Sequence, residues 1–276
     1  MSDAQTPASG EGFPPLSGPT DLRGRVALVT GVGRRRGIGS AVCRALASRG
    51  ADVVFSFWVA YDREMPWASE GDEPRSLLGE LRDAGIRAEG VEVDLSPPDS
   101  ARRLLDRAGE AIGRPSILVN VAAYSTGDGF EELDAETLDA HYAVNVRAMA
   151  LLSVEFARRY PGGPGGRIVN FSSGQSLGPM PGELAYAATK GAIEAFTRTL
   201  AAEVGHKGIT VNAVNPGPTD TGWISGELEK DLLPRFPLGR IGQPEDAARL
   251  VAFLASDEAA WITGQIINSE GGFVRS

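Results

Sequence analysis

The stretch "YAATK" pairs a tyrosine with a lysine at a spacing that can support proton transfer. Tyr186 and Lys190 lie four residues apart in a segment that we expect to be helical, so both side chains should lie on one helix face. A free tyrosine has a pKa of about 10 and is a poor acid–base group at neutral pH. A neighbouring ammonium group favours the phenolate and lowers that pKa, so the pair predicts an acid–base catalyst.

A serine after a predicted strand offers a hydrogen-bond donor for the same chemistry. Ser173 ends the stretch "NFSS", and its hydroxyl can bond a substrate carbonyl or alkoxide oxygen. Each residue also has a purely structural interpretation. A tyrosine–lysine pair is common on helix surfaces, and Ser172 and Ser173 could cap a turn. The occurrence of the serine, tyrosine and lysine together therefore supports a catalytic site more strongly than any one of them alone.

The segment "TGVGRRRGIG", residues 30–39, has the composition of a phosphate-binding turn. It lies between a predicted strand and a predicted helix, the context in which such glycines are informative. Gly31, Gly37 and Gly39 let the chain turn sharply and bring backbone amides close to a pyrophosphate. The helix that begins at Ile38 adds the positive end of its dipole. The alternative is a tight turn without a ligand, but we expect a dinucleotide site.

Two later strand ends supply further candidates for the nucleotide site. Asp94, followed by Leu95, ends the third predicted strand, where its carboxylate can accept a hydrogen bond from an adenine amine. Asn120 ends the fourth and is followed by small residues, among them Ala122, which permit close approach of a cofactor. In a parallel sheet these strand ends meet beside the glycine turn.

The elements that would position these residues alternate along the chain from about residue 25. Strands are predicted at 25–31, 51–57, 88–95, 116–123, 166–173, 209–217 and 264–272. Helices are predicted at 38–49, 72–84, 99–112, 134–160, 184–205 and 244–255. Several strands are apolar throughout, which is typical of a parallel sheet buried between helical layers. We therefore predict one α/β domain over residues 23–276, a Rossmann-type doubly wound parallel sheet of about seven strands with helices on both faces.

Composition excludes several classes of protein. The Pro-, Gly- and Ser-rich segment 1–22 is predicted to be a disordered tail and does not resemble a secretory signal. No apolar run reaches the roughly 20 residues that cross a bilayer, and a net charge of −9 argues against nucleic acid or anionic lipid as a partner. A single cysteine excludes an internal disulfide, which fits a cytoplasmic protein, and the two distant histidines argue against a metal site.

Together these motifs resemble the short-chain dehydrogenases/reductases, most closely their 3-oxoacyl-[acyl-carrier-protein] reductase-like branch. The resemblance covers about residues 22–276. Besides the residues above, it rests on Asn145 in "HYAVNVRA", on "NPGPTDT" from Asn215, and on the ending "ASDEAAWITGQIINSEGG". The sequence departs from the family pattern in three places. Two extra residues lie between Gly31 and Gly37, "NVAA" replaces the usual NNAG, and the connection at 57–74 is long.

The resemblance implies an enzyme that transfers hydride reversibly between a nicotinamide cofactor and a ketone or aldehyde. Tyr186 would be the proton donor, Ser173 would bond the reacting oxygen, and Lys190 would hold the nicotinamide ribose. Asn145 would hold a water that relays protons to Lys190. The "NPGPTDT" loop would close over the nicotinamide, with contacts from Pro216, Gly217, Thr219 and Thr221.

The resemblance also frames the choice of cofactor. In this family an acidic residue at the end of the second strand selects NAD, whereas NADP users tend to carry a basic residue in the glycine turn. Phe57 stands in the acid's place, and the turn holds Arg34, Arg35 and Arg36. Guanidinium groups bind phosphate through two parallel hydrogen bonds, so we expect NADP(H). Asp62 in the long connection could instead fold back onto the ribose and favour NAD(H).

The segment 219–243 is predicted to be a substrate lid. It is apolar enough for an aliphatic or cyclic carbonyl or alcohol substrate, although several of its side chains could simply anchor it to the core. Those side chains are Trp223, Ile224, Leu228, Leu232, Leu233 and Phe236. Fold and motifs do not identify the substrate.

Partners are less clearly indicated. Three arginines of helix 99–112 could form a weak patch for an acyl carrier protein, although a solvated helix face is the simpler interpretation. Helices rich in small apolar residues suit subunit packing, and the family is usually a homotetramer or homodimer. The alternatives to an NADP(H)-dependent reductase are an NAD-dependent secondary-alcohol dehydrogenase, a nucleotide-binding regulatory protein without turnover, and a member with non-redox chemistry.

Overall fold

A seven-stranded parallel sheet forms the centre of the protein. The structure is a computed structural model that describes residues 21–65 and 72–275. Within these residues the strands lie in the order β3-β2-β1-β4-β5-β6-β7, and every neighbouring pair is parallel. They are β1 (Val26–Val29), β2 (Asp52–Phe57), β3 (Ala88–Glu92), β4 (Ile117–Asn120), β5 (Gly166–Phe171), β6 (Ile209–Asn215) and β7 (Ile266–Asn268). The predicted doubly wound sheet is confirmed, and its order reverses between β1 and β4, where a crevice is expected.

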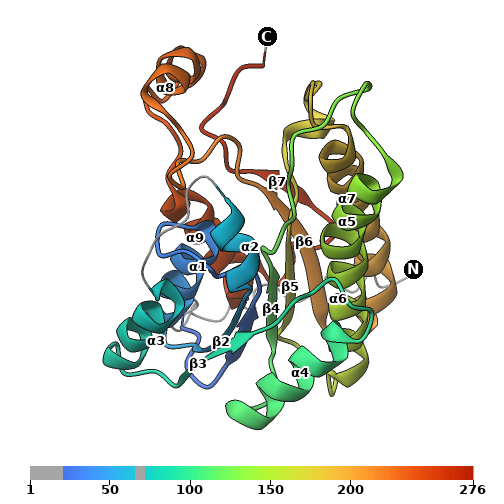
Figure 1. Cartoon of the computed structure of the whole chain (residues 1–276). Coiled ribbons are helices and arrows are strands. Elements are labelled where there is room, and N and C mark those ends of the chain that lie inside the picture. The colour runs from blue at the N-terminus through green and yellow to red at the C-terminus, as the bar shows by residue number, and fades with distance from the viewer. Residues whose placement is uncertain (1–20, 66–71, 276) are drawn as a thin grey trace, which may run out of the picture.

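Helices cover both faces of the sheet (Figure 1). Those packed on the first face are α1 (Ile38–Ala47), α3 (Glu73–Asp83) and α9 (Pro244–Ala255). Those on the second face are α4 (Ser100–Ala111), α6 (Met149–Arg159) and α7 (Leu184–Val204). Alternate strand residues point to opposite faces, so Ala27 and Val29 join one core while Val26 and Leu28 join the other. Burial of each large apolar side chain contributes roughly 1.5–3 kcal/mol, and these two cores fix the sheet that carries the site.

The predicted helix 134–160 is interrupted in its middle. It begins as α5 (Ala135–His141), continues as a π-helix over Tyr142–Ala148, and returns to α-helix in α6. Asp134 caps its start by accepting a hydrogen bond from the Thr137 amide at 2.8 Å. The wide π-helical turns include Asn145 and turn its side chain into the protein interior. Short π-helices inside α-helices are often found at functional sites.

Two connections that we expect to be irregular contain helices. The 57–74 connection includes α2 (Val59–Glu64), and the 219–243 segment includes α8 (Gly226–Leu232), which stands away from the body of the sheet in Figure 1. Each helix is only six or seven residues long. That is too short for a repeating pattern of apolar residues to reveal it in the sequence. Ser225 caps α8 by accepting from the Leu228 amide.

The ends of the predicted domain fall partly outside the described residues. Of the predicted tail, residues 1–20 lie outside them, while Leu22 is fully buried in the first core. The middle of the 57–74 connection, residues 66–71, also lies outside them. None of the helices over 21–65 and 72–275 is long and apolar enough to cross a membrane.

Candidate active site

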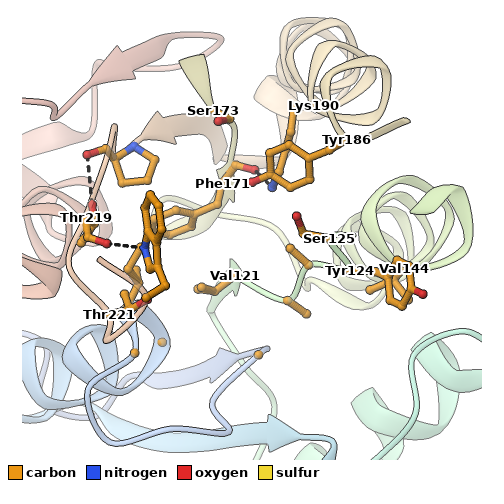
Figure 2. Close-up of a pocket in the computed structure, with 18 of the residues that line it drawn as sticks. Val121, Tyr124, Ser125, Val144, Phe171, Ser173, Tyr186, Lys190, Thr219 and Thr221 are labelled. Carbon is orange, nitrogen blue, oxygen red and sulfur yellow. Dashed lines mark hydrogen bonds between the residues drawn. The ribbon is translucent and has the colours of Figure 1, made fainter. Parts of the chain in front are cut away.

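A cleft of about 1100 Å³ opens at the carboxyl end of the sheet. One end is lined by the glycine turn after β1, and the other by the segment after β5 and the start of α7. The loop after β6 forms a third wall. Figure 2 shows Ser173, Tyr186 and Lys190 on one side of this space and the Thr219–Thr221 loop on another. The fold therefore brings the predicted catalytic and nucleotide-binding segments to one cavity.

Tyr186 and Lys190 share one face of α7, as their spacing predicts. The Lys190 ammonium is buried, lies 5.2 Å from the centre of the Tyr186 ring, and donates a hydrogen bond to the Phe171 carbonyl at 2.8 Å. Ser173 lies opposite the ring in the same cleft. The neighbouring Ser172 is committed elsewhere, because its hydroxyl donates to the buried Glu194 carboxylate at 2.7 Å. Ser173 is thus the serine whose position suits contact with a ligand.

The protonation of this group differs from the sequence expectation. Burial raises the pKa of the Tyr186 phenol, the Glu183 carboxylate raises it further, and a hydrogen bond with Ser173 opposes both. Lys190 was expected to lower that pKa, but its ammonium is directed at the Phe171 carbonyl rather than at the phenol oxygen. Burial lowers the pKa of Lys190 itself to about 8. At neutral pH the site therefore pairs a protonated phenol with a lysine close to its point of titration.

Asn145 is fully engaged by the protein. Its side-chain oxygen accepts from the Tyr124 amide at 2.7 Å, and its side-chain nitrogen donates to the Tyr124 carbonyl at 2.9 Å and the Thr189 hydroxyl at 3.1 Å. Thr189 precedes Lys190 on α7. The asparagine therefore ties the loop after β4 to the helix that carries the tyrosine and lysine.

The glycines of the turn allow its backbone to pack closely against the loop after β4 and against itself. Gly31 has φ +74°, and a Cβ added there would lie 2.6 Å from the backbone of Ala122. A Cβ at Gly39 would lie 2.6 Å from the Gly31 carbonyl oxygen. Gly37 is the N-cap residue of α1, and no side chain accepts a hydrogen bond from the first amides of the helix. Gly37, Ile38 and Gly39, at this helix start, line the cleft. Uncapped amides at a helix N-terminus suit an anion, and these residues fit a dinucleotide pyrophosphate.

The three arginines of the turn point in different directions. Arg34 lines the cleft and donates to the Thr221 carbonyl at 2.9 Å, which links the glycine turn to the opposite loop. Arg35 turns outward to Glu80 on α3, with a nitrogen–oxygen distance of 3.0 Å. Arg36 forms an ion pair with Asp220. Arg35 and Arg36 do not line the cleft, because acidic partners hold both outside its wall, and their contact with a cofactor stays a prediction.

Asp62 folds back onto the glycine turn from α2. A Cβ added at Gly33 would lie 1.7 Å from its carboxylate, so the two residues are in direct contact. Burial raises the pKa of Asp62, and the nearby Arg34 guanidinium opposes the rise. Phe57, in the place where the resemblance leads us to look for an acid, also lines the cleft. The same end of the cleft thus carries one cation and one carboxylate.

Three of the four strand-end candidates line the cleft. Leu95, Ala122 and Asp94 are part of its wall, and the Asp94 carboxylate accepts from the Ser96 amide and hydroxyl, each at 2.8 Å. The side chain of Asn120 is buried beneath the wall and does not line the cleft, and a contact between this residue and a cofactor stays a prediction. Its amide donates to Asn170 at 2.8 Å and to Ser153 at 3.1 Å, because its alternating position on β4 turns it into the second core face.

The loop after β6 closes one side of the cleft with Pro216, Gly217, Thr219 and Thr221. The Trp223 indole lines the cleft and donates to the Thr219 carbonyl at 2.8 Å (Figure 2). Most of the other apolar residues of the 219–243 segment pack together, whereas Leu233 and Leu238 are exposed. Leu232, Phe236 and Ile241 form a small core of their own, against which Ile224, Leu228 and Phe273 pack.

The structure adds cleft residues that the sequence analysis does not assign. Among them are Tyr61 on α2, Ser125 after β4, Glu183 before α7, Arg235 in the 219–243 segment and Arg275 near the end of the chain. Only the unusual length of the 57–74 connection pointed toward one of them. Over 21–65 and 72–275, no group of three or more His, Cys, Asp and Glu residues could hold a metal ion.

Comparisons with known proteins place this cleft in context. A family model described as enoyl-(acyl carrier protein) reductase matches residues 31–274. The uncharacterized oxidoreductase YjdA of Bacillus subtilis is 52% identical over 253 residues, covering 91% of this chain and 97% of that protein. A short-chain dehydrogenase/reductase from Serratia marcescens superposes with a TM-score of 0.80 at 34% identity, over 91% of this chain and 99% of that one. A blue fluorescent protein from a metagenomic library, solved with NADPH, superposes with a TM-score of 0.82 at 32% identity, over 92% and 100%.

Proposed function

From the premise that this chain belongs to the short-chain dehydrogenase/reductase family, we propose that it is an NADP(H)-dependent oxidoreductase that reversibly reduces a ketone or aldehyde to an alcohol. The observation that carries the proposal is the convergence of Ser173, Tyr186 and Lys190 on a cleft whose other end is a glycine turn at a helix N-terminus. A carbonyl held between the serine and the tyrosine would lie within reach of a dinucleotide bound along that cleft.

The catalytic residues have distinct roles in this proposal. The bound nicotinamide supplies or accepts the hydride. Tyr186, protonated at neutral pH, donates its phenolic proton to the oxygen of the substrate during reduction. Ser173 donates a hydrogen bond to the same oxygen and stabilises its developing negative charge. The Lys190 ammonium holds the ribose, and Asn145 keeps the surrounding loop and α7 in register.

The cofactor would bind along the wall from the glycine turn to the β6 loop. Amides at the start of α1 would hold the pyrophosphate, with Gly31, Gly37 and Gly39 allowing its approach. The adenine would lie near Asp94, Leu95 and Ala122, and the nicotinamide beneath Pro216, Gly217, Thr219 and Thr221. Arg34 would bind the 2′-phosphate of NADP(H), because a guanidinium group can donate two parallel hydrogen bonds to a phosphate.

Asp62 supports a second candidate, an NAD-dependent alcohol dehydrogenase. Its carboxylate lies against Gly33 beside Arg34, where it could accept hydrogen bonds from ribose hydroxyls and repel a 2′-phosphate. We favour NADP(H) because Arg34 can both neutralise Asp62 and bind phosphate, and because a structural neighbour was solved with NADPH. In either case the reaction and the roles of Tyr186 and Ser173 are the same.

The experiment that separates the two candidates is a parallel titration with NADPH and NADH, followed by nicotinamide fluorescence. Tighter binding of NADPH supports the proposal, and tighter binding of NADH supports the dehydrogenase. An Asp62→Asn variant serves as the matched control, because it keeps the side-chain shape and removes the charge. We expect it to strengthen NADPH binding. Turnover is then assayed with a panel of ketones and aldehydes, and failure to reduce any carbonyl would contradict both candidates.

A further inference from the structure

Helix α2 places a tyrosine in the same cleft as the proposed catalytic tyrosine. Tyr61 is half-buried and lines the cleft, although it comes from the 57–74 connection rather than from the segments that carry the proposed chemistry. Its neighbour Asp62 contacts the glycine turn. Consecutive residues of one short helix therefore reach the glycine turn, through Asp62, and the loop after β4, through Tyr61.

The Tyr61 side chain is held in one orientation. Its ring packs on the ring of Tyr124, with centroids 5.6 Å apart and planes tilted by 48°. Its hydroxyl oxygen accepts a hydrogen bond from the Ser125 amide at 3.3 Å. In Figure 2 the Ser125 side chain points toward Tyr186, so this anchor lies on the wall facing the catalytic phenol. The Tyr61 phenol is thus held against the loop after β4, on a wall of the cleft.

The proton of that hydroxyl is available to a ligand. A phenol has one O–H donor and can accept as well, and the Ser125 amide uses only its accepting side. Across residues 21–65 and 72–275, no side chain or carbonyl accepts the Tyr61 proton. The charge on an ionised Tyr61 would raise the pKa of Tyr186, which places the two phenols within electrostatic reach of each other. A donor in this position can bond a substrate oxygen other than the one that Tyr186 protonates.

We infer that Tyr61 is a specificity-determining residue, whose phenol donates a hydrogen bond to a second oxygen of the substrate next to the reacting carbonyl. The inference rests on the proposed function, because it assumes that Tyr186 and Ser173 bind the carbonyl oxygen. It assigns the substrate class as ketones with a neighbouring oxygen, such as α-hydroxyketones. A plain ketone of the same size covers the half-buried Tyr61 hydroxyl and displaces water without accepting its proton, and a donor left unpaired in this way is costly.

The test compares hydroxyacetone with 2-butanone, which differ by a hydroxyl in place of a methyl group. The value of kcat/KM for each ketone is measured with NADPH for the natural protein and for Tyr61→Phe, which keeps the ring and removes the hydroxyl. We expect the variant to reduce kcat/KM for hydroxyacetone about 3- to 10-fold more than for 2-butanone, the range for one lost hydrogen bond. Most of that loss should appear in KM, because the contact is made in the bound substrate.

Matched controls separate this role from general damage to the cleft. Tyr124→Phe removes a phenol from the ring that packs on Tyr61, but the Tyr124 ring turns toward His141, with centroids 5.0 Å apart. We expect it to leave the ratio of the two kcat/KM values unchanged. NADPH binding, measured by fluorescence, should be the same for the natural protein and Tyr61→Phe, which verifies that the glycine turn is intact.

Each outcome decides the inference. A selective loss on hydroxyacetone in Tyr61→Phe alone supports it. An equal loss on both ketones, no loss, or a preference for 2-butanone in the natural protein would overturn it while leaving the proposed function in place. A protein that reduces other carbonyls but neither of these two would also overturn it. Failure to reduce any carbonyl at all would refute the proposed function, and the inference with it.

Discussion

Lys190 is the residue whose charge should control the pH dependence of the reaction. Burial lowers its pKa from the ordinary 10.5 to about 8, so the ammonium is present below that pH and is lost above it. The proposed role of Lys190 requires the ammonium. We therefore expect kcat/KM for carbonyl reduction to be level below pH 8 and to fall about tenfold per pH unit above it, measured with a neutral ketone.

A Lys190→Met variant provides the control for this pH dependence. It removes the titrating group and should lower kcat/KM at neutral pH while abolishing the decline near pH 8. If the variant retained the same decline, another group would be responsible and the role given to Lys190 would be wrong.

The arginines of the glycine turn give a second prediction at the same scale. Arg34 lines the cleft, whereas Arg35 is bonded to Glu80 outside it. A charge-assisted hydrogen bond is worth about 1.5–3 kcal/mol, so Arg34→Ala should weaken NADPH binding about 10- to 100-fold. Arg35→Ala, the matched control, should change it less than twofold. Equal effects of the two substitutions, measured by fluorescence titration, would mean that the turn acts only through its overall charge.

The sequence alone could not show which arginine of this turn faces the cleft. Three consecutive arginines look equivalent in the sequence, and only the acidic groups around them distinguish their roles. Glu80 lies on α3 and Asp220 lies after β6, far from the turn in the sequence. By contrast, the positions of Tyr186 and Lys190 followed from their spacing of four residues, because helical periodicity alone places them on one face.

At the scale of elements, α7 depends on a carboxylate supplied from outside the helix. Asp128 is buried, and its two oxygens accept hydrogen bonds from the amides of Leu184 and Ala185 at 2.5 and 2.9 Å. The helix has no capping side chain from its own N-cap residue, Glu183. Asp128 therefore accepts the hydrogen bonds of the first amides of the helix that carries Tyr186. Its negative charge also interacts favourably with the positive end of the helix dipole.

Removal of this cap should affect both stability and catalysis. We expect Asp128→Ala to lower the free energy of unfolding by about 1–3 kcal/mol, measured by urea denaturation, and to lower kcat. Asp128→Asn keeps one accepting oxygen and should recover part of both losses. Unchanged kcat in a destabilised Asp128→Ala protein would show that the start of α7 is not a determinant of the active-site geometry.

Strands and helices long enough to show a repeating pattern of apolar residues could be predicted from the sequence, and shorter or irregular elements could not. Each predicted strand overlaps an observed one, and the strong helical patterns of α1, α4 and α9 gave their positions within a few residues. The π-helix over Tyr142–Ala148 could not be recognised from the spacing of apolar residues, because it is defined by the hydrogen bonds of its backbone. Helix α2 is too short to show a period, so the cleft role of Tyr61 was hidden as well.

At the scale of the whole molecule, the described residues form two large cores on the sheet and a separate small core within the 219–243 segment and around Phe273. Phe156 is buried in the second large core, while Phe236 is buried in the small one, with its ring centre 4.9 Å from that of Phe273. The small core anchors the segment that forms one wall of the cleft. Stability and substrate binding should therefore respond differently to equivalent substitutions at these two sites.

We expect Phe156→Ala to lower the free energy of unfolding by about 3–5 kcal/mol, the usual cost of truncating a buried aromatic residue. Phe236→Ala should cost less in global stability, because the small core lies apart from the sheet, but should raise KM for the substrate. Urea denaturation and steady-state kinetics on both variants check this separation. A large global destabilisation by Phe236→Ala with unchanged KM would mean that the 219–243 segment belongs structurally to the main cores.

Reduction of carbonyl groups in this cleft should depend on Tyr186 as the proton donor. The most direct measurement compares Tyr186→Phe with the natural protein in NADPH-dependent reduction of the best carbonyl substrate, alongside NADPH binding by fluorescence. We expect the variant to lose at least about 100-fold in kcat, the low end for a general acid, while it binds NADPH with similar affinity. Retention of full reductase activity by Tyr186→Phe would contradict the proposed mechanism.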